Sequence, residues 1–216
     1  MPLPNRVTPY GTRIATPERG LFWGNRGCLH NAQGEFVRYS AVKAWLICLL
    51  QFKGRRRRLL APGRLSELFF LDEATALAAG HRPCGECRHE ALAAFKRAWP
   101  GRDDGTPPAA PAIDARLHLE RLRAPGLRRT HWEQVGELPQ GAIFEWRGTP
   151  RLRWQEGSLE WTPGGYLPAE PPSPQLKVRV ITPRSTVATL ARGYRPVVHP
   201  SADRWIAGRA PSRLDT

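Results

Sequence analysis

The fold of the first half of this chain is decided by the stretch LDEATALAAGHRPCGECR, residues 71–88. Asp72 is suited to N-cap a short helix of small apolar residues, and Gly80 to stop that helix in the left-handed conformation. Pro83 then prevents the helix from continuing. This order of signals predicts a short helix followed by a sharp turn that presents Cys84 and Cys87 together, with a second helix from near Cys87 to Trp99.

The two cysteines of this turn have the spacing of zinc ligands. Cys84 and Cys87 are separated by two residues, which lets both thiolates bind one tetrahedral zinc ion. The chain contains two other cysteines, Cys28 and Cys48, so the sequence predicts a four-sulfur shell formed by Cys28, Cys48, Cys84 and Cys87. Cys28 lies with His30 in a glycine-rich loop, and Cys48 lies in an apolar segment for which we favour a strand over a buried helix.

The same region resembles a known family. The run from Phe69-Phe70 to Cys87 is similar to the second half of the zinc-binding N-terminal domain of Ada-type DNA alkylation-repair proteins, most clearly over residues 66–90 and at most over 22–99. The resemblance implies zinc, DNA binding and methyl transfer from a phosphotriester to a zinc-bound cysteine. The family pattern has two earlier cysteines four residues apart; here Cys48 is followed by Phe52, so the missing ligand must be Cys28, His30, His81 or His89.

Charge favours a polyanionic partner. The 216-residue chain has a formal net charge of +14, and basic residues that neutralise phosphates release condensed counterions. Nucleic acid is therefore the expected partner, DNA rather than RNA, against the alternative of a merely basic surface. The predicted phosphate-binding residues are the run after the Cys48 strand and two arginines beside the cysteines: Lys53, Arg55, Arg56, Arg57, Arg58, Arg82 and Arg88.

The sequence divides into two parts. Residues 1–99 form the predicted zinc module, and the Pro- and Gly-rich residues 100–112 read as a linker. Residues 113–216 are expected to form helices and an antiparallel meander that pack on the first part. Helices are predicted at residues 113–122 and 130–138. The meander follows at residues 142–146, 151–155 and 158–161, and a strand comes after it at 176–181. The fold class is therefore α+β.

A segment near the C-terminus is similar in sequence to the predicted zinc-binding segment. Residues 185–196 align with residues 72–83, so that Gly193 matches Gly80 and Arg195-Pro196 matches Arg82-Pro83, but no cysteine follows. This pattern predicts a second strand, short helix and glycine stop. Duplication and convergence both account for it.

Two further functions compete with nucleic-acid binding. Asp114 and His118 are one helical turn apart and could form half of the metal site of a hydrolase or nuclease, completed by His131, Glu120 or Glu133. The other alternative is an interaction protein with a purely structural zinc. The small number of cysteines favours a location in the reducing cytoplasm. No apolar run is long enough to span a membrane. The sequence does not identify a catalytic residue.

Overall fold

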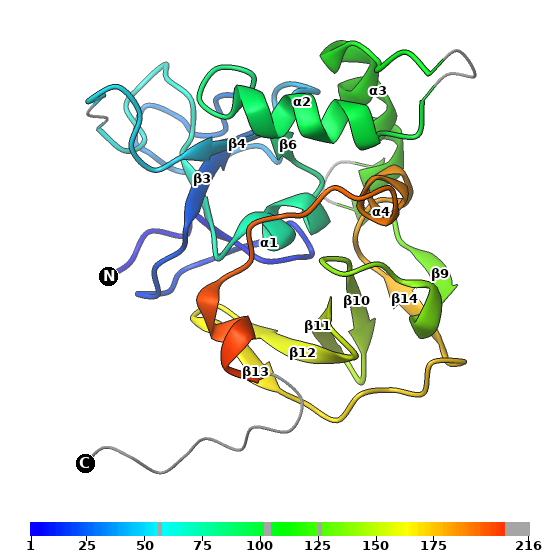
Figure 1. Cartoon of the computed structure of the whole chain (residues 1–216). Coiled ribbons are helices and arrows are strands. Elements are labelled where there is room, and N and C mark those ends of the chain that lie inside the picture. Colours follow the sequence, from blue (N-terminus) through cyan, green and yellow to red (C-terminus); the bar gives the residue numbers. More distant parts are fainter. Residues whose placement is uncertain (56–57, 102–104, 125–126, 206–216) are drawn as a thin grey trace.

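The computed structural model describes residues 1–55, 58–101, 105–124 and 127–205. It confirms the α+β class: within these ranges the chain forms two six-stranded sheets with helices between and beside them (Figure 1). Arg56 and Arg57 of the arginine run lie outside the described residues. None of the helices in the described ranges is both long and apolar enough to cross a membrane.

The first sheet is built from the N-terminal half in the order β2-β1-β5-β3-β4-β6. Its strands are β1 (Arg6–Val7), β2 (Arg13–Ile14), β3 (Phe22–Asn25), β4 (Leu46–Leu49), β5 (Leu68–Phe70) and β6 (Arg82–Pro83). Cys48 therefore lies in a strand, as expected. β3 separates β4 from β5, and it pairs antiparallel with both.

Two helices follow the local signals of residues 71–99. Helix α1 (Glu73–Ala78) begins after Asp72, whose carboxylate accepts the backbone N–H of Thr75 at 2.8 Å. The chain leaves this helix through Gly80 at a φ of +89°, which glycine adopts without steric cost. After β6 and the cysteine turn, α2 (His89–Ala98) runs to Trp99. Both expected helices are confirmed.

The second sheet comes from the C-terminal half in the order β13-β12-β11-β10-β14-β9, and all its pairs are antiparallel. Its strands are β9 (His131–Gln134), β10 (Ile143–Trp146), β11 (Thr149–Trp154), β12 (Gly157–Thr162), β13 (Gly165–Pro168) and β14 (Lys177–Val180). The meander is confirmed. The helix expected at 130–138 is wrong: pairing with β14 satisfies this backbone as a strand, and only the short 3₁₀ turn η1 (Val135–Glu137) follows.

The remaining elements surround this frame. They are α3 (Ala110–Arg121), the small hairpin β7 (Leu122–Ala124) and β8 (Leu127–Arg128), α4 (Arg184–Ala191) and η2 (Pro200–Trp205). Helix α3 begins inside the stretch expected to be a linker. The similarity between residues 72–83 and 185–196 extends to the structure. β14 and α4 repeat the order of β5 and α1, and the chain leaves α4 through Gly193 at a φ of +99°.

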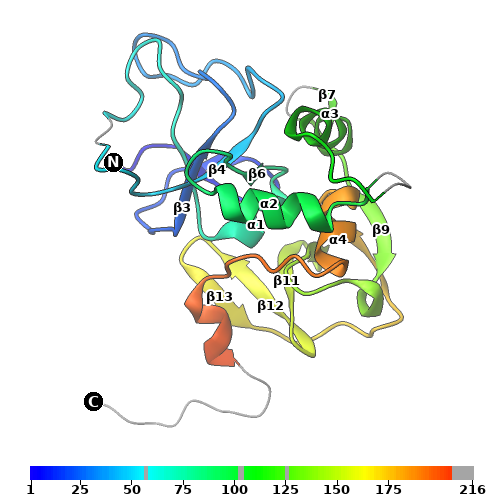
Figure 2. The same cartoon turned by 45° about the horizontal axis from the view of Figure 1, so that its top comes forward.

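Helix α1 lies between the two sheets, and all six of its residues are buried (Figures 1 and 2). Ala76 and Leu77 belong to the core cluster that contains Phe70 of the first sheet, whereas Ala74 and Ala78 pack with Ile143 of the second. The small apolar residues of α1 thus contact both sheets. The small side chains of α1 therefore let both halves of the chain share one interior.

Acidic side chains at the start of α1 hold the C-terminal segment. The carboxylate of Asp72 accepts the backbone N–H of His199 at 3.0 Å. The carboxylate of Glu73 accepts the Tyr194 hydroxyl at 2.6 Å and the backbone N–H of Val197 at 2.9 Å. The segment after α4 is thereby fixed to the helix that introduces the cysteine turn.

Candidate metal centre

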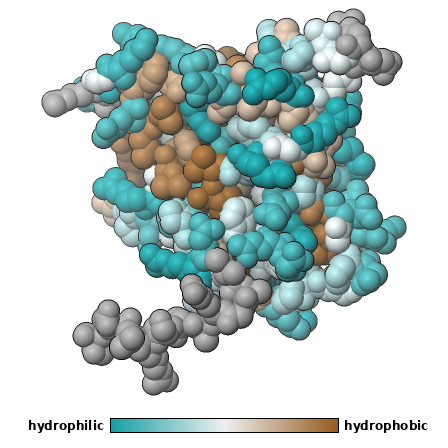
Figure 3. All heavy atoms as spheres, viewed as in Figure 1, coloured by the Kyte–Doolittle hydropathy of each residue, from teal (hydrophilic) through white to brown (hydrophobic). Residues whose placement is uncertain are grey.

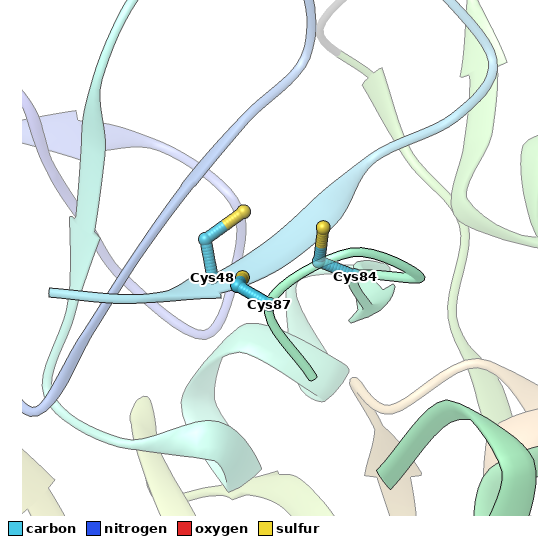
Figure 4. Close-up of side chains that lie close together, drawn as sticks. All are labelled: Cys48, Cys84 and Cys87. Carbon is cyan, nitrogen blue, oxygen red and sulfur yellow. The ribbon is translucent and has the colours of Figure 1, made fainter. Parts of the chain in front are cut away.

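The candidate metal centre lies where β4, β6 and the start of α2 meet. β4 and β6 pair in parallel, with Ile47 opposite Pro83, so the next residues, Cys48 and Cys84, are neighbours across the two strands. The backbone N–H of Cys84 donates to the carbonyl of Ile47 at 2.9 Å. The turn that follows brings Cys87 to the same place (Figure 4).

Three sulfur atoms converge here. The Sγ atoms of Cys48, Cys84 and Cys87 all lie within 4.8 Å of one another. Zinc–sulfur bonds of about 2.3 Å in a tetrahedron place the sulfurs about 3.8 Å apart, so a small inward movement of the thiolates suffices. Among the described residues, this is the one group of three or more His, Cys, Asp or Glu side chains that could hold a metal ion.

Hydrogen bonds to the Cys84 sulfur favour its thiolate form. The Cys84 sulfur accepts hydrogen bonds from the Cys48 thiol and from the backbone N–H groups of Cys87 and Glu86, the last at 3.4 Å, and these lower the pKa of Cys84. Donating to Cys84 raises the pKa of Cys48, and burial adds to the rise. The backbone N–H groups at the turn thus act as a small anion-binding nest.

Cys28 does not join this group, so the expected four-sulfur shell needs correction. Its thiol donates to the backbone carbonyl of His30 at 3.6 Å. The His30 ring is buried and engaged elsewhere, with Nδ1 at 2.6 Å from the Ser66 hydroxyl and Nε2 at 3.1 Å from the Ala61 carbonyl. The glycine-rich loop packs in the first half without bringing either residue to the three sulfurs.

The other two candidates for a fourth ligand also lie apart from the three-cysteine group. His81 is fully buried between Phe70 and Trp45, and Arg26 donates to its Nε2 at 3.3 Å. His89 is the exposed first residue of α2. The described residues therefore bring together three side chains, those of Cys48, Cys84 and Cys87, that could bind a metal ion.

Arg82 and Arg88 anchor the two ends of the cysteine turn. The Arg82 guanidinium donates to both carboxylate oxygens of Asp114 in α3, at 2.8 and 2.7 Å, and each side chain is 7% exposed. Arg88 donates to both oxygens of Glu73 in α1, at 2.8 and 2.9 Å, and lies over the Phe22 ring. The prediction that these two arginines form part of a phosphate-binding face is corrected by their burial.

The other predicted phosphate contacts lie on the surface. Lys53, Arg55 and Arg58 are exposed in the segment after β4. Arg55 forms an ion pair with Glu86 at 2.5 Å, which links this segment to the cysteine turn. Three cations of the predicted set are thus exposed on this segment, and Arg55 lies beside the cysteine turn.

The Asp114 and His118 pair does not form a metal site in this structure. Both Asp114 oxygens are occupied by Arg82, and Nδ1 of His118 lies 3.3 Å from the guanidinium of Arg121. Partial burial, together with Arg121 and Lys43, lowers the pKa of His118. The geometry gives the hydrolase alternative no support.

A row of side chains that leads to the sulfurs was not predicted from the sequence. Across the first sheet, Arg6 pairs with Phe69, Phe69 with Trp23 and Trp23 with Cys48. Directly paired residues point to the same face of a sheet, so these side chains form one row that ends at the metal centre. A proline-rich start without strand-length apolar runs gave no signal for β1.

No protein-family model matches this chain, and neither a curated protein sequence nor a solved structure is significantly similar to it.

Proposed function

We propose that this protein is a zinc-binding protein that binds nucleic acid, with a role in DNA repair. The observation that carries the zinc assignment is the convergence of three cysteine sulfurs from two separate segments, β4 and the turn before α2. Thiolate ligands select soft or borderline metals, and tetrahedral sulfur sites favour zinc. A bound zinc ion keeps its cysteine ligands deprotonated, so they stay competent for alkylation.

The donor set supports kinship with the Ada-type zinc domain. Cys48 lies in a strand and Cys84 and Cys87 lie in a turn before a helix, which is the arrangement expected from the resemblance. Phe52 stands where the family pattern has its second cysteine. Zinc sites with three protein ligands keep one position open, so we assign Cys48, Cys84 and Cys87 as the ligands and leave the fourth position to a non-protein ligand.

The nucleic-acid assignment is supported by charge. The net charge is +14, and the exposed cations Lys53, Arg55 and Arg58 lie on the segment that follows the Cys48 strand. The four cysteines are unpaired, which suits the reducing cytoplasm in which we place the protein. DNA is the preferred partner because the resemblance concerns DNA-binding proteins.

The salt dependence of DNA binding tests this function. Changing Lys53, Arg55 and Arg58 together to glutamine should weaken binding about equally across sequences and reduce the log–log salt slope by about 0.9 unit for each phosphate that is no longer neutralised. The matched control changes three exposed arginines of the C-terminal half, Arg147, Arg184 and Arg192. Equal slopes for the two variants would mean that the segment after β4 has no special role.

A further inference from the structure

The face of the first sheet that carries Cys48 is hollowed beside the metal centre. The opposite face, which carries Phe22, Ile47 and Phe70, is buried in the main core. On the Cys48 face, a hollow of about 150 Å³ is lined by Trp23, Phe52 and their neighbours. A second hollow of about 400 Å³ extends toward the N-terminal segment.

The two hollows form one continuous groove, because Leu50, Leu59 and Phe69 line both. We call it the apolar groove and define it by Trp23, Leu49, Leu50, Phe52, Leu59 and Phe69. Its leucines are well exposed, at 37% for Leu49, 50% for Leu50 and 43% for Leu59. Figure 3 shows a hydrophobic area on the side of the molecule where β3 and β4 lie. Exposed apolar patches of this kind mark binding sites.

Cations lie at both ends of the apolar groove. Arg6 and Arg19 line the end toward the N-terminal segment, and Arg55 lines the end toward the cysteine turn. Arg6 is 7% exposed, and its Nη1 has no hydrogen-bond partner. A guanidinium nitrogen that donates to no protein group can donate to a phosphate oxygen.

Two carboxylates also line the groove. Glu67 is buried and accepts the backbone N–H of Leu60 at 3.0 Å. Glu18 is exposed beside Arg6 and Arg19. Burial and the charge of Arg19 lower the pKa of Arg6, and Glu18 opposes this fall. Glu18 is one carboxylate beside two guanidinium groups, Arg6 and Arg19, so this end of the groove keeps a net positive charge.

We propose that the apolar groove binds single-stranded nucleic acid, with bases against its apolar and aromatic side chains and phosphates on Arg6 and Arg19 at one end and on Arg55 at the other. Single-strand binding surfaces combine a cationic path for the backbone with side chains on which unpaired bases stack. A duplex keeps its base faces stacked and offers only phosphates, sugars and groove edges, so it would not place base faces against the exposed leucines. This inference rests on the proposed nucleic-acid function and specifies the form of the partner.

Fluorescence anisotropy with a labelled oligothymidylate, and with a duplex of the same length at the same salt, tests the groove. Leu50→Glu places a negative charge inside it. Leu167→Glu is the matched control, because Leu167 is 48% exposed on β13 of the other sheet. We expect the zinc-loaded protein to prefer the single strand, Leu50→Glu to weaken that binding about tenfold, and Leu167→Glu to leave it unchanged.

The outcomes separate this inference from the function on which it rests. Equal or tighter binding of the duplex, or equal effects of the two variants, would overturn the groove as a single-strand site while nucleic-acid binding stood. Failure to bind either nucleic acid would overturn both. Binding of an apolar peptide in place of the oligonucleotide, abolished by Leu50→Glu, would identify the groove as a protein-docking site and would also reject the inference.

Discussion

Breaking the ion pair between Arg82 and Asp114 should be among the most damaging single changes in this chain. The pair has two hydrogen bonds of 2.8 and 2.7 Å, and both side chains are 7% exposed. Removing one partner of such a pair leaves a buried charge unpaired and costs about 3–5 kcal/mol. Asp114→Asn should therefore lower the free energy of unfolding by about that amount, as measured by equilibrium urea unfolding of the zinc-loaded protein.

Two further variants make this test decisive. Glu170→Gln removes one partner of the exposed Arg147–Glu170 pair, whose side chains are 66% and 72% exposed, and should cost at most about 1 kcal/mol. The double replacement Arg82→Met with Asp114→Leu removes both buried charges and should recover most of the loss. A cost below about 1 kcal/mol for Asp114→Asn would mean that the buried ion pair with Arg82 does not stabilise the fold, and would leave Asp114 free for another role, including that of a metal ligand.

Two other predictions concern the neighbourhood of α1. Gly80→Ala should destabilise the protein by at least about 1 kcal/mol more than Gly193→Ala. Both residues have a positive φ, but only a Cβ at Gly80 would clash with a neighbour, at 2.8 Å from Cδ of Arg121. Chemical denaturation of both variants checks this difference, and equal losses of unfolding free energy would contradict it. Burial, together with Arg26, Arg121 and Arg128, lowers the pKa of His81 well below its usual 6.5, so the unfolded chain binds a proton that the folded chain does not. Stability should then fall by about 1.4 kcal/mol per pH unit below about pH 6.5, and His81→Gln should remove that slope; parallel pH profiles of the two proteins would contradict the assignment.

Local signals predicted the elements whose ends are fixed by particular residues. Asp72, Gly80 and Pro83 set the limits of α1 and the turn that follows it, and the Cys-x-x-Cys spacing identified two of the three converging cysteines. Cys48 could be placed in a strand because its segment is apolar. These features depend on capping, on backbone conformation and on metal geometry, all of which act over a few residues.

Features that depend on tertiary pairing were not predicted. β1 has two residues and exists because Arg6 pairs with Phe69. β9 replaced an expected helix because β14 offers it a partner. Arg82 and Arg88 carry charges that suit phosphates as well as carboxylates, and only the fold places Asp114 and Glu73 beside them. A charge run in a sequence does not reveal which of its members will be buried.

The zinc content of four cysteine variants decides whether Cys48, Cys84 and Cys87 form the metal centre. Cys48→Ser, Cys84→Ser and Cys87→Ser each remove one of the three converging sulfurs, whereas Cys28→Ser removes the sulfur that lies apart. Elemental analysis after purification without chelator should find about one zinc per chain in the unmodified protein and in Cys28→Ser, and strongly reduced zinc in the other three, since removing any of these thiolates weakens the site. Absence of metal from the unmodified protein, or a fall in zinc content in Cys28→Ser equal to that in the other three, would rule out a zinc site formed by these three cysteines.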